Sequence, residues 1–128
     1  MAKLKAMNEA WINIDGTSYQ GDLVTTRREL DRVFGKQEFY PGDKVNFEWV
    51  LAFEDDQGET LVGTIYDYKN YDHILGEDEV YSWHLGGHDK SISYEILKAF
   101  IQRGGIVHEI PNAGGKKTWT PFGYHYAS

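Results

Sequence analysis

The chain has 128 residues, with 20 acidic against 13 basic side chains, a net charge of −7 and no cysteine. This length fits one domain with a core of its own, and the lack of cysteine excludes disulfides, thiolate zinc sites and cysteine nucleophiles. No apolar run approaches the roughly 20 residues of a membrane span, and no signal-peptide pattern is present. We therefore expect a cytoplasmic protein with no membrane partner.

The negative charge is concentrated in the middle third of the chain. Residues 38–79 carry twelve acidic side chains against Lys44 and Lys69, a net charge of −10, whereas both flanking segments are slightly positive. Because Lys and Arg supply most non-specific affinity for phosphates, we expect no direct nucleic-acid binding. A basic protein surface is the partner that such a field favours. The alternative is a solvated sheet face with its loops.

The N-terminal part predicts a flexible end followed by a hairpin. Residues 1–10 show no clear period and are expected to be flexible. The next two β-prone runs, residues 11–14 and 17–20, are joined by Asp15-Gly16. Both turn residues tolerate positive φ, so the pattern predicts that the two runs pair as a β-hairpin.

A first helix is predicted from Arg27 to Phe34. Thr26 precedes it as the N-cap, and Glu29 stands where a capping box places an acid that reaches back to the cap. Gly35 follows the last apolar residue, where a left-handed conformation ends many helices.

Three strands and a second helix are expected next. The clearest strand is Val45–Glu54, and its alternation predicts these residues for the core: Val45, Phe47, Trp49, Leu51 and Phe53. A turn at residues 55–58 leads into a strand at residues 60–68, and a third strand covers residues 80–85. Apolar spacing predicts a helix over residues 92–103, capped by Asp89 or Ser91.

The remaining residues complete the expected architecture. Residues 106–110 read as one more strand, and the aromatic tail, residues 111–128, is expected to pack on the domain or on a partner. The sequence predicts one α+β domain over residues 11–110. Its antiparallel sheet has about five or six strands, with two helices packed on one face, in the order ββ-α-βββ-α-β. An exposed strand edge or the tail also allows a homodimer.

Tyrosines beside the acidic segment form the candidate partner-binding surface. Tyr and Trp are frequent at interface hot spots because they bury much area and keep a polar handle. The candidate partner-binding residues are Asp55, Asp56, Tyr66, Tyr68, Tyr71, Glu77, Asp78, Glu79 and Tyr81. The same rings could instead belong to the core of a small sheet.

An alternative is a small-molecule site in the segment that precedes the second helix. Glycines ahead of a helix N-terminus let backbone N–H groups approach a phosphate, and His88 and Lys90 add positive charge there. The candidate residues for such a nucleotide site are Trp83, His84, Gly86, Gly87, His88 and Lys90. A third possibility is a metal-dependent enzyme that uses His84 and His88. No spacing selects a pair of carboxylates or a serine nucleophile, so we assign no catalytic residue, metal or cofactor.

Four short motifs resemble small bacteriophage-encoded proteins that have no assigned reaction. The motifs are Asp15-Gly-Thr-Ser-Tyr-Gln-Gly21, Glu48-Trp49, Thr64-Ile-Tyr-Asp-Tyr-Lys69 and Trp83-His-Leu-Gly-Gly87. The resemblance spans roughly residues 11–103 and implies a phage accessory role. Size and charge are similar to those of counter-defence inhibitors such as anti-CRISPR proteins. The leading hypothesis is therefore a non-enzymatic protein that occludes a basic, nucleic-acid-binding surface of a host protein.

Overall fold

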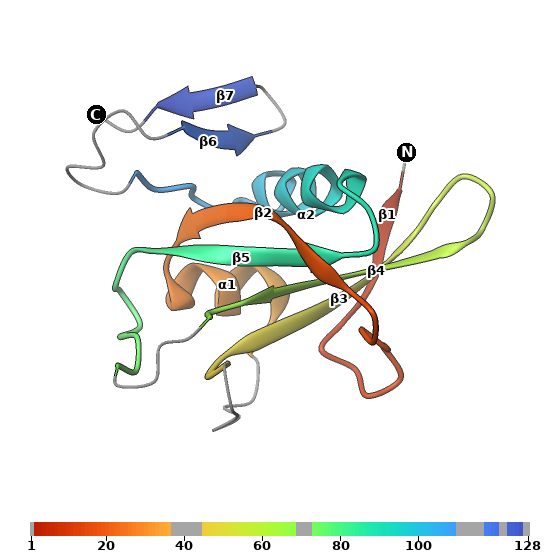
Figure 1. Ribbon diagram of the computed structural model, residues 1–128, viewed down its shortest axis with the longest axis horizontal. Coiled ribbons are helices and arrows are strands. Elements are labelled where there is room, and N and C mark those ends of the chain that lie inside the picture. Colours follow the sequence, from red (N-terminus) through yellow and green to blue (C-terminus); the bar gives the residue numbers. More distant parts are fainter. Residues whose placement is uncertain (1, 37–44, 69–72, 110–116, 121–122, 127–128) are drawn as a thin grey trace.

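The structure, a computed structural model, describes residues 2–36, 45–68, 73–109, 117–120 and 123–126. The elements follow in this order (Figure 1): β1 (Lys3–Met7), β2 (Ser18–Thr25), α1 (Arg27–Phe34), β3 (Glu48–Glu54), β4 (Thr60–Tyr66), β5 (Tyr81–Gly87), α2 (Ser91–Gln102), β6 (Lys117–Thr120) and β7 (Gly123–Tyr126). Among the described residues, no helix has both the length and the apolar character that a membrane crossing requires.

Strands β1 to β5 form one antiparallel sheet in the order β1-β3-β4-β5-β2. This confirms the predicted α+β class, a five-stranded sheet with two helices. The strands β1 and β2 follow one another in the chain but lie at opposite edges of the sheet (Figure 1). The segment between them therefore carries the chain across the width of the sheet.

The predicted N-terminal hairpin is wrong. A turn does form at Asp15-Gly16, with Gly16 at φ 80° and the Thr17 N–H donating to the Ile14 carbonyl at 3.1 Å. However, residues 11–14 are not a strand, and β2 pairs with β5. The segment expected to be flexible contains β1, which pairs with β3 and packs two apolar side chains against the core: Leu4 and Met7. A turn signal fixes where the chain bends, whereas burial decides which strands pair.

Helix α1 has the predicted bounds. Its N-cap is Thr26, whose hydroxyl oxygen accepts from the Glu29 N–H at 3.2 Å, and Gly35 takes φ 87° after the last turn. The second half of the predicted capping box is wrong. The Glu29 carboxylate instead accepts from Arg32 at 2.6 Å and from the Ile106 N–H at 3.0 Å, which ties α1 to the segment after α2.

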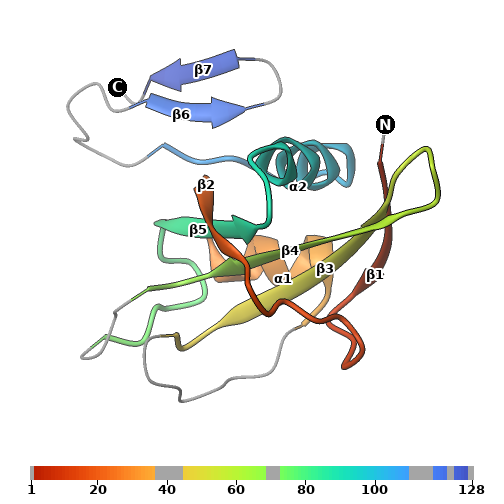
Figure 2. The same cartoon turned by 45° about the vertical axis from the view of Figure 1, so that its right-hand side comes forward.

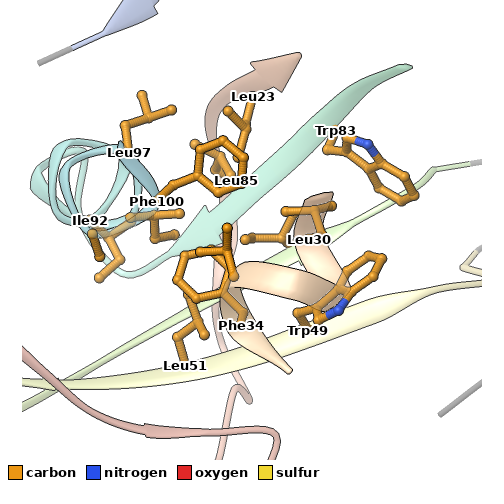
Figure 3. Packing of buried hydrophobic residues seen from close by; sticks show 14 of the residues in the cluster. Leu23, Leu30, Phe34, Trp49, Leu51, Trp83, Leu85, Ile92, Leu97 and Phe100 are labelled. Atoms are coloured by element: carbon orange, nitrogen blue, oxygen red, sulfur yellow. The ribbon is translucent and has the colours of Figure 1, made fainter. Parts of the chain in front are cut away.

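One apolar cluster fills the space between the sheet and both helices (Figure 3). Of the five predicted core residues of β3 and its approach, four are at most 2% exposed: Phe47, Trp49, Leu51 and Phe53. The rings of Phe34 in α1 and Phe100 in α2 lie 6.0 Å apart, so both helices cover the same face. We call this the inner face of the sheet and the opposite one the outer face.

Glycines let α2 lie close to the inner face. A Cβ at Gly87 would come within 2.3 Å of Ile92 Cγ2, and one at Gly63 within 2.9 Å of the Ile92 and Ile96 side chains. Helix α2 begins one residue before its predicted start, after a turn in which the Asp89 carboxylate accepts from the Ser91 N–H at 2.8 Å. The lack of a side chain at Gly63 and Gly87 thus sets the distance between the sheet and α2.

The predicted strand at residues 106–110 is wrong for its described part. Residues 106–109 have no strand conformation, although the His108 N–H donates to the Val24 carbonyl at 2.8 Å and the Thr25 hydroxyl to the Ile106 carbonyl at 2.8 Å. Beyond them, β6 and β7 form a separate antiparallel pair. Strand β6 lies beside β2 and α2, and Figure 2 shows the pair beyond α2, away from β3.

Candidate binding site on the outer face of the sheet

Four residues form a row across the outer face. In register, Glu48 of β3 pairs with Tyr66 of β4, Tyr66 with His84 of β5, and His84 with Asp22 of β2. Side chains alternate along a strand, so the row faces away from the core residues that flank it, such as Trp49 and Ile65. This cross-strand row, Glu48–Tyr66–His84–Asp22, places two ring-bearing side chains between two carboxylates.

Aromatic rings gather around His84. The Tyr68 ring stacks on it, with centroids 5.4 Å apart and an interplanar angle of 27°, while the Tyr19 and Tyr66 rings lie 4.8 Å and 5.5 Å away at steeper angles. Tyr19 is 53% exposed and Tyr68 is 37% exposed. The rings therefore present apolar faces at the surface, which is typical of protein interfaces.

Gly86 makes room for this ring cluster. A Cβ at Gly86 would lie 2.8 Å from Thr64 Cγ2 and 3.2 Å from the ring of Tyr66. A side chain at this position of β5 would therefore press on both Thr64 and the Tyr66 ring. Gly86 and Gly87 serve the two faces separately, because Gly87 meets Ile92 of α2 on the inner face.

A hydroxyl group holds each carboxylate of the row. The Tyr19 hydroxyl donates to Asp22 at 2.8 Å, and the Thr64 hydroxyl donates to Glu48 at 2.6 Å. Burial raises the pKa of the Glu48 carboxyl, and burial followed by the Glu48 charge raises the pKa of Tyr66. Partial burial and the hydrogen bond to Asp22 raise the pKa of Tyr19 to about 12. The carboxylates and tyrosines of the outer face thus form one electrostatically connected site.

The predicted loop acids lie at opposite ends of β4. Asp55 and Asp56 are in the β3–β4 hairpin, whereas Glu77, Asp78 and Glu79 belong to the connection from β4 to β5. The seven residues of β4 separate the two groups by about 20 Å. The structure therefore does not bring the loop acids together into one acidic patch.

Several loop acids also have partners within the chain. Arg28 of α1 binds Asp78 at 2.7 Å and Glu77 at 3.6 Å, and the pKa of Asp78 is lowered by this hydrogen bond. The carboxylate of Glu79 accepts from the Gly76 N–H at 3.2 Å. Arg28 therefore offsets part of the negative charge of the β4–β5 connection.

The predicted aromatic residues divide between the two faces. Tyr66 and Tyr68 join the ring cluster of the outer face, and Tyr71 lies outside the described residues. Tyr81 and Trp83 belong to the inner face, where their rings lie 5.1 Å apart and Trp83 is fully buried. Alternation along β5 therefore removes Tyr81, one of the predicted partner-binding residues, from the outer face.

The predicted nucleotide loop is a strand. Gly86 and Gly87 are the last residues of β5 and are buried, so they do not form a loop in front of α2. Trp83 and His84 point to opposite faces of the sheet, and His88 and Lys90 are exposed in the turn that follows. The six residues of this prediction therefore do not converge on one site.

The predicted metal centre is not supported by the described residues. Among them, no group of three or more His, Asp or Glu side chains could hold an ion. His84 lies on the outer face, and His88 follows after the last three residues of β5. An extended backbone of this length holds the two imidazoles apart, unlike the i and i+4 positions of a helix.

Sequence reasoning missed Tyr19, Asp22, Glu48 and Thr64. The alternation of β3 already placed Glu48 opposite the core, which was a signal for an outer-face carboxylate. Tyr19 and Asp22 carried no such signal, because their partners in β5, Gly86 and His84, lie more than 60 positions further along the chain. Comparison of the chain with protein-family models, with curated proteins and with solved structures finds no match.

Proposed function

We propose that this protein binds a basic surface of a partner protein through the outer face of its sheet, without catalysing a reaction. The observation that carries the proposal is the cross-strand row, in which the half-buried rings of Tyr66 and His84 lie between two carboxylates, with the exposed rings of Tyr68 and Tyr19 beside them. Aromatic rings supply buried area at an interface, and carboxylates complement Lys and Arg. The charge of −10 over residues 38–79 would speed the encounter with a basic partner.

The biological role that fits such a surface is inhibition. Surfaces that hold nucleic acid are rich in Lys and Arg, so a protein that covers one of them displaces the nucleic acid. The resemblance of the sequence motifs to bacteriophage-encoded proteins favours a counter-defence inhibitor that acts on a host protein in the host cytoplasm. Steric occlusion then needs no catalytic residue and no cofactor.

A basic peptide probe tests the proposal without a known partner. We expect a fluorescent deca-arginine peptide to bind the full chain, with a dissociation constant that rises with ionic strength mainly through slower association. The Tyr66→Ala/Tyr68→Ala variant should lose this binding. Tyr94→Ala is the matched control, because Tyr94 is also exposed (38%) but lies on α2. Absence of peptide binding, or equal binding by the double variant, would overturn the proposal.

The loop acids test the steering component separately. Neutralising them should slow association while leaving dissociation nearly unchanged, since charges at the rim act on the encounter. The variant replaces Asp55, Asp56, Glu77, Asp78 and Glu79 by their amides. An association rate that is unchanged by this variant and by salt would remove electrostatic steering from the mechanism.

A second candidate function is small-molecule binding in a cavity of about 370 Å³ between β2 and α2. Lys90 lines it together with Ser93, whose Oγ is buried and has no hydrogen-bond partner among the described residues. Lys90 is the one residue that this cavity shares with the predicted nucleotide site. Saturable thermal stabilisation by a nucleotide, lost in Lys90→Ala, would support this function. A full nucleotide series without any shift would exclude it.

A further inference from the structure

The ring cluster offers flat aromatic faces, which select among basic groups. Tyr68 stacks on His84, and the exposed fractions of Tyr68 and Tyr19 leave ring surface accessible. A guanidinium is planar, weakly hydrated and stacks on aromatic faces, whereas the ammonium of lysine is a compact and strongly hydrated charge. Flat rings at a surface therefore favour arginine over lysine.

The two carboxylates of the row define where the N–H groups of an arginine ligand would bind. Asp22 and Glu48 lie three strand spacings apart along the row, which is about 14 Å. A single guanidinium cannot bridge this distance, so each end of the row serves its own cation. The hydroxyls of Tyr19 and Thr64 orient the two carboxylates, and a carboxylate can accept about four hydrogen bonds, enough for a hydroxyl and a bidentate fork.

We infer that the cross-strand row is a two-point arginine site, in which guanidinium groups of a partner stack on the rings while their N–H groups bind Asp22 and Glu48. This inference rests on the proposed function and names the side chain that the outer face recognises. Nucleobases also stack on aromatic rings, but their phosphates would meet both carboxylates and the negative charge of residues 38–79.

Three peptides of one length separate the contributions of charge and shape. Each carries two variable positions in a neutral background, occupied by arginine, by lysine or by citrulline, the uncharged isostere of arginine. We expect the arginine peptide to bind most tightly to the full chain. The citrulline peptide should bind at least about tenfold more weakly, because it lacks the charge-assisted hydrogen bonds.

Variants of the row locate the contacts. Asp22→Asn and Glu48→Gln should each weaken arginine-peptide binding about tenfold, and the double variant should reduce it to the level of the citrulline peptide. The matched control is Glu9→Gln/Asp15→Asn, which removes two exposed carboxylates in the connection between β1 and β2, outside the row and outside residues 38–79. Thermal unfolding of each variant shows that the fold is retained.

The outcomes distinguish this inference from the proposed function. Equal affinity for the arginine and lysine peptides would overturn the guanidinium site and leave a general site for basic partners. Equal affinity for the arginine and citrulline peptides would show that the charge of the guanidinium does not contribute to binding at the row, which would also overturn the guanidinium site. If none of the peptides binds, the proposed function fails as well. Binding of a single-stranded oligonucleotide that Asp22→Asn and Glu48→Gln strengthen would assign the rings to nucleic acid and overturn both.

Discussion

Replacing Gly87 by alanine adds one methyl group where the backbone of β5 lies against Ile92 of α2. The new Cβ would be 2.3 Å from Ile92 Cγ2 and 2.9 Å from Ile92 Cβ, whereas carbon atoms in contact lie about 3.5–4.0 Å apart. Helix α2 would have to move outward by about 1 Å, and the buried residues that it packs on the sheet would move with it.

The expected loss of stability follows from two opposing terms. Overpacking a well-packed core costs about 1–3 kcal/mol. Alanine also reduces the conformational entropy of the unfolded chain, which returns about 0.4–1 kcal/mol. We expect a net loss of about 1–2 kcal/mol in the free energy of unfolding, or a melting temperature lower by roughly 3–8 °C for a chain of this length.

Urea and thermal unfolding of three proteins measure this loss: the wild type, Gly87→Ala and the control Gly76→Ala. At Gly76 the nearest atom to a new Cβ is 3.9 Å away, so the control should remain within about 0.5 kcal/mol of the wild type. The Ile92→Ala background removes the atom at 2.3 Å and should reduce the cost of Gly87→Ala. An unchanged stability of Gly87→Ala, or an equal cost in both backgrounds, would refute the packing argument.

Three further predictions concern the outer face and its support. Burial raises the pKa of Glu48 above its ordinary 4.5, so ionisation of this carboxyl destabilises the folded state as pH rises. In urea unfolding, Glu48→Gln should therefore have a higher free energy of unfolding than the wild type at about pH 7 and the same free energy at about pH 4. A pH-independent difference would contradict this. Asp67 is fully buried and accepts from the backbone N–H groups of residues 46 and 47 at 2.8 and 2.9 Å. Asp67→Ala should therefore cost about 2–3 kcal/mol by urea denaturation, and Asp67→Asn less; equal losses would show that the acceptor is not what matters. Gly86→Ala should displace the Tyr66 ring and weaken binding of the deca-arginine peptide while Gly76→Ala does not, and unchanged affinity in the first variant would contradict the role of Gly86.

Local signals in the sequence were sufficient for the elements that depend on near neighbours. Thr26 and Gly35 bracket α1, and the alternation of β3 identifies the side chains that reach the core. The β3–β4 hairpin follows in the same way, with Gly58 at φ 78° in its turn. In each case the information lies within about ten residues, where capping, periodicity and turn chemistry act.

Pairing between distant segments was not accessible in this way. Lys3–Met7 has no strong strand pattern, and it forms a strand through its pairing with the edge of β3. The glycine pair at the end of β5 looks like a ligand loop when read locally, and only the positions of Ile92 and Tyr66 show what it accommodates. Only part of the candidate site could be predicted, for the same reason. Its rings and carboxylates come from segments that lie far apart in the chain and meet only through the pairing of four strands.

The order of strands in the sheet also affects when the outer face can form during folding. Strand β5 lies between β4 and β2 and is the last of the three in the chain, so β2 acquires its partner only after residues 81–87 are in place. The β3–β4 hairpin closes a short loop, whereas the pairing of β2 with β5 closes a loop of about 60 residues. The larger entropic cost of closing this long loop makes the β2–β5 pairing a late event in folding. A nascent chain without β5 therefore has no continuous row from Glu48 to Asp22. Binding of the proposed partner at the row would therefore require the completed fold.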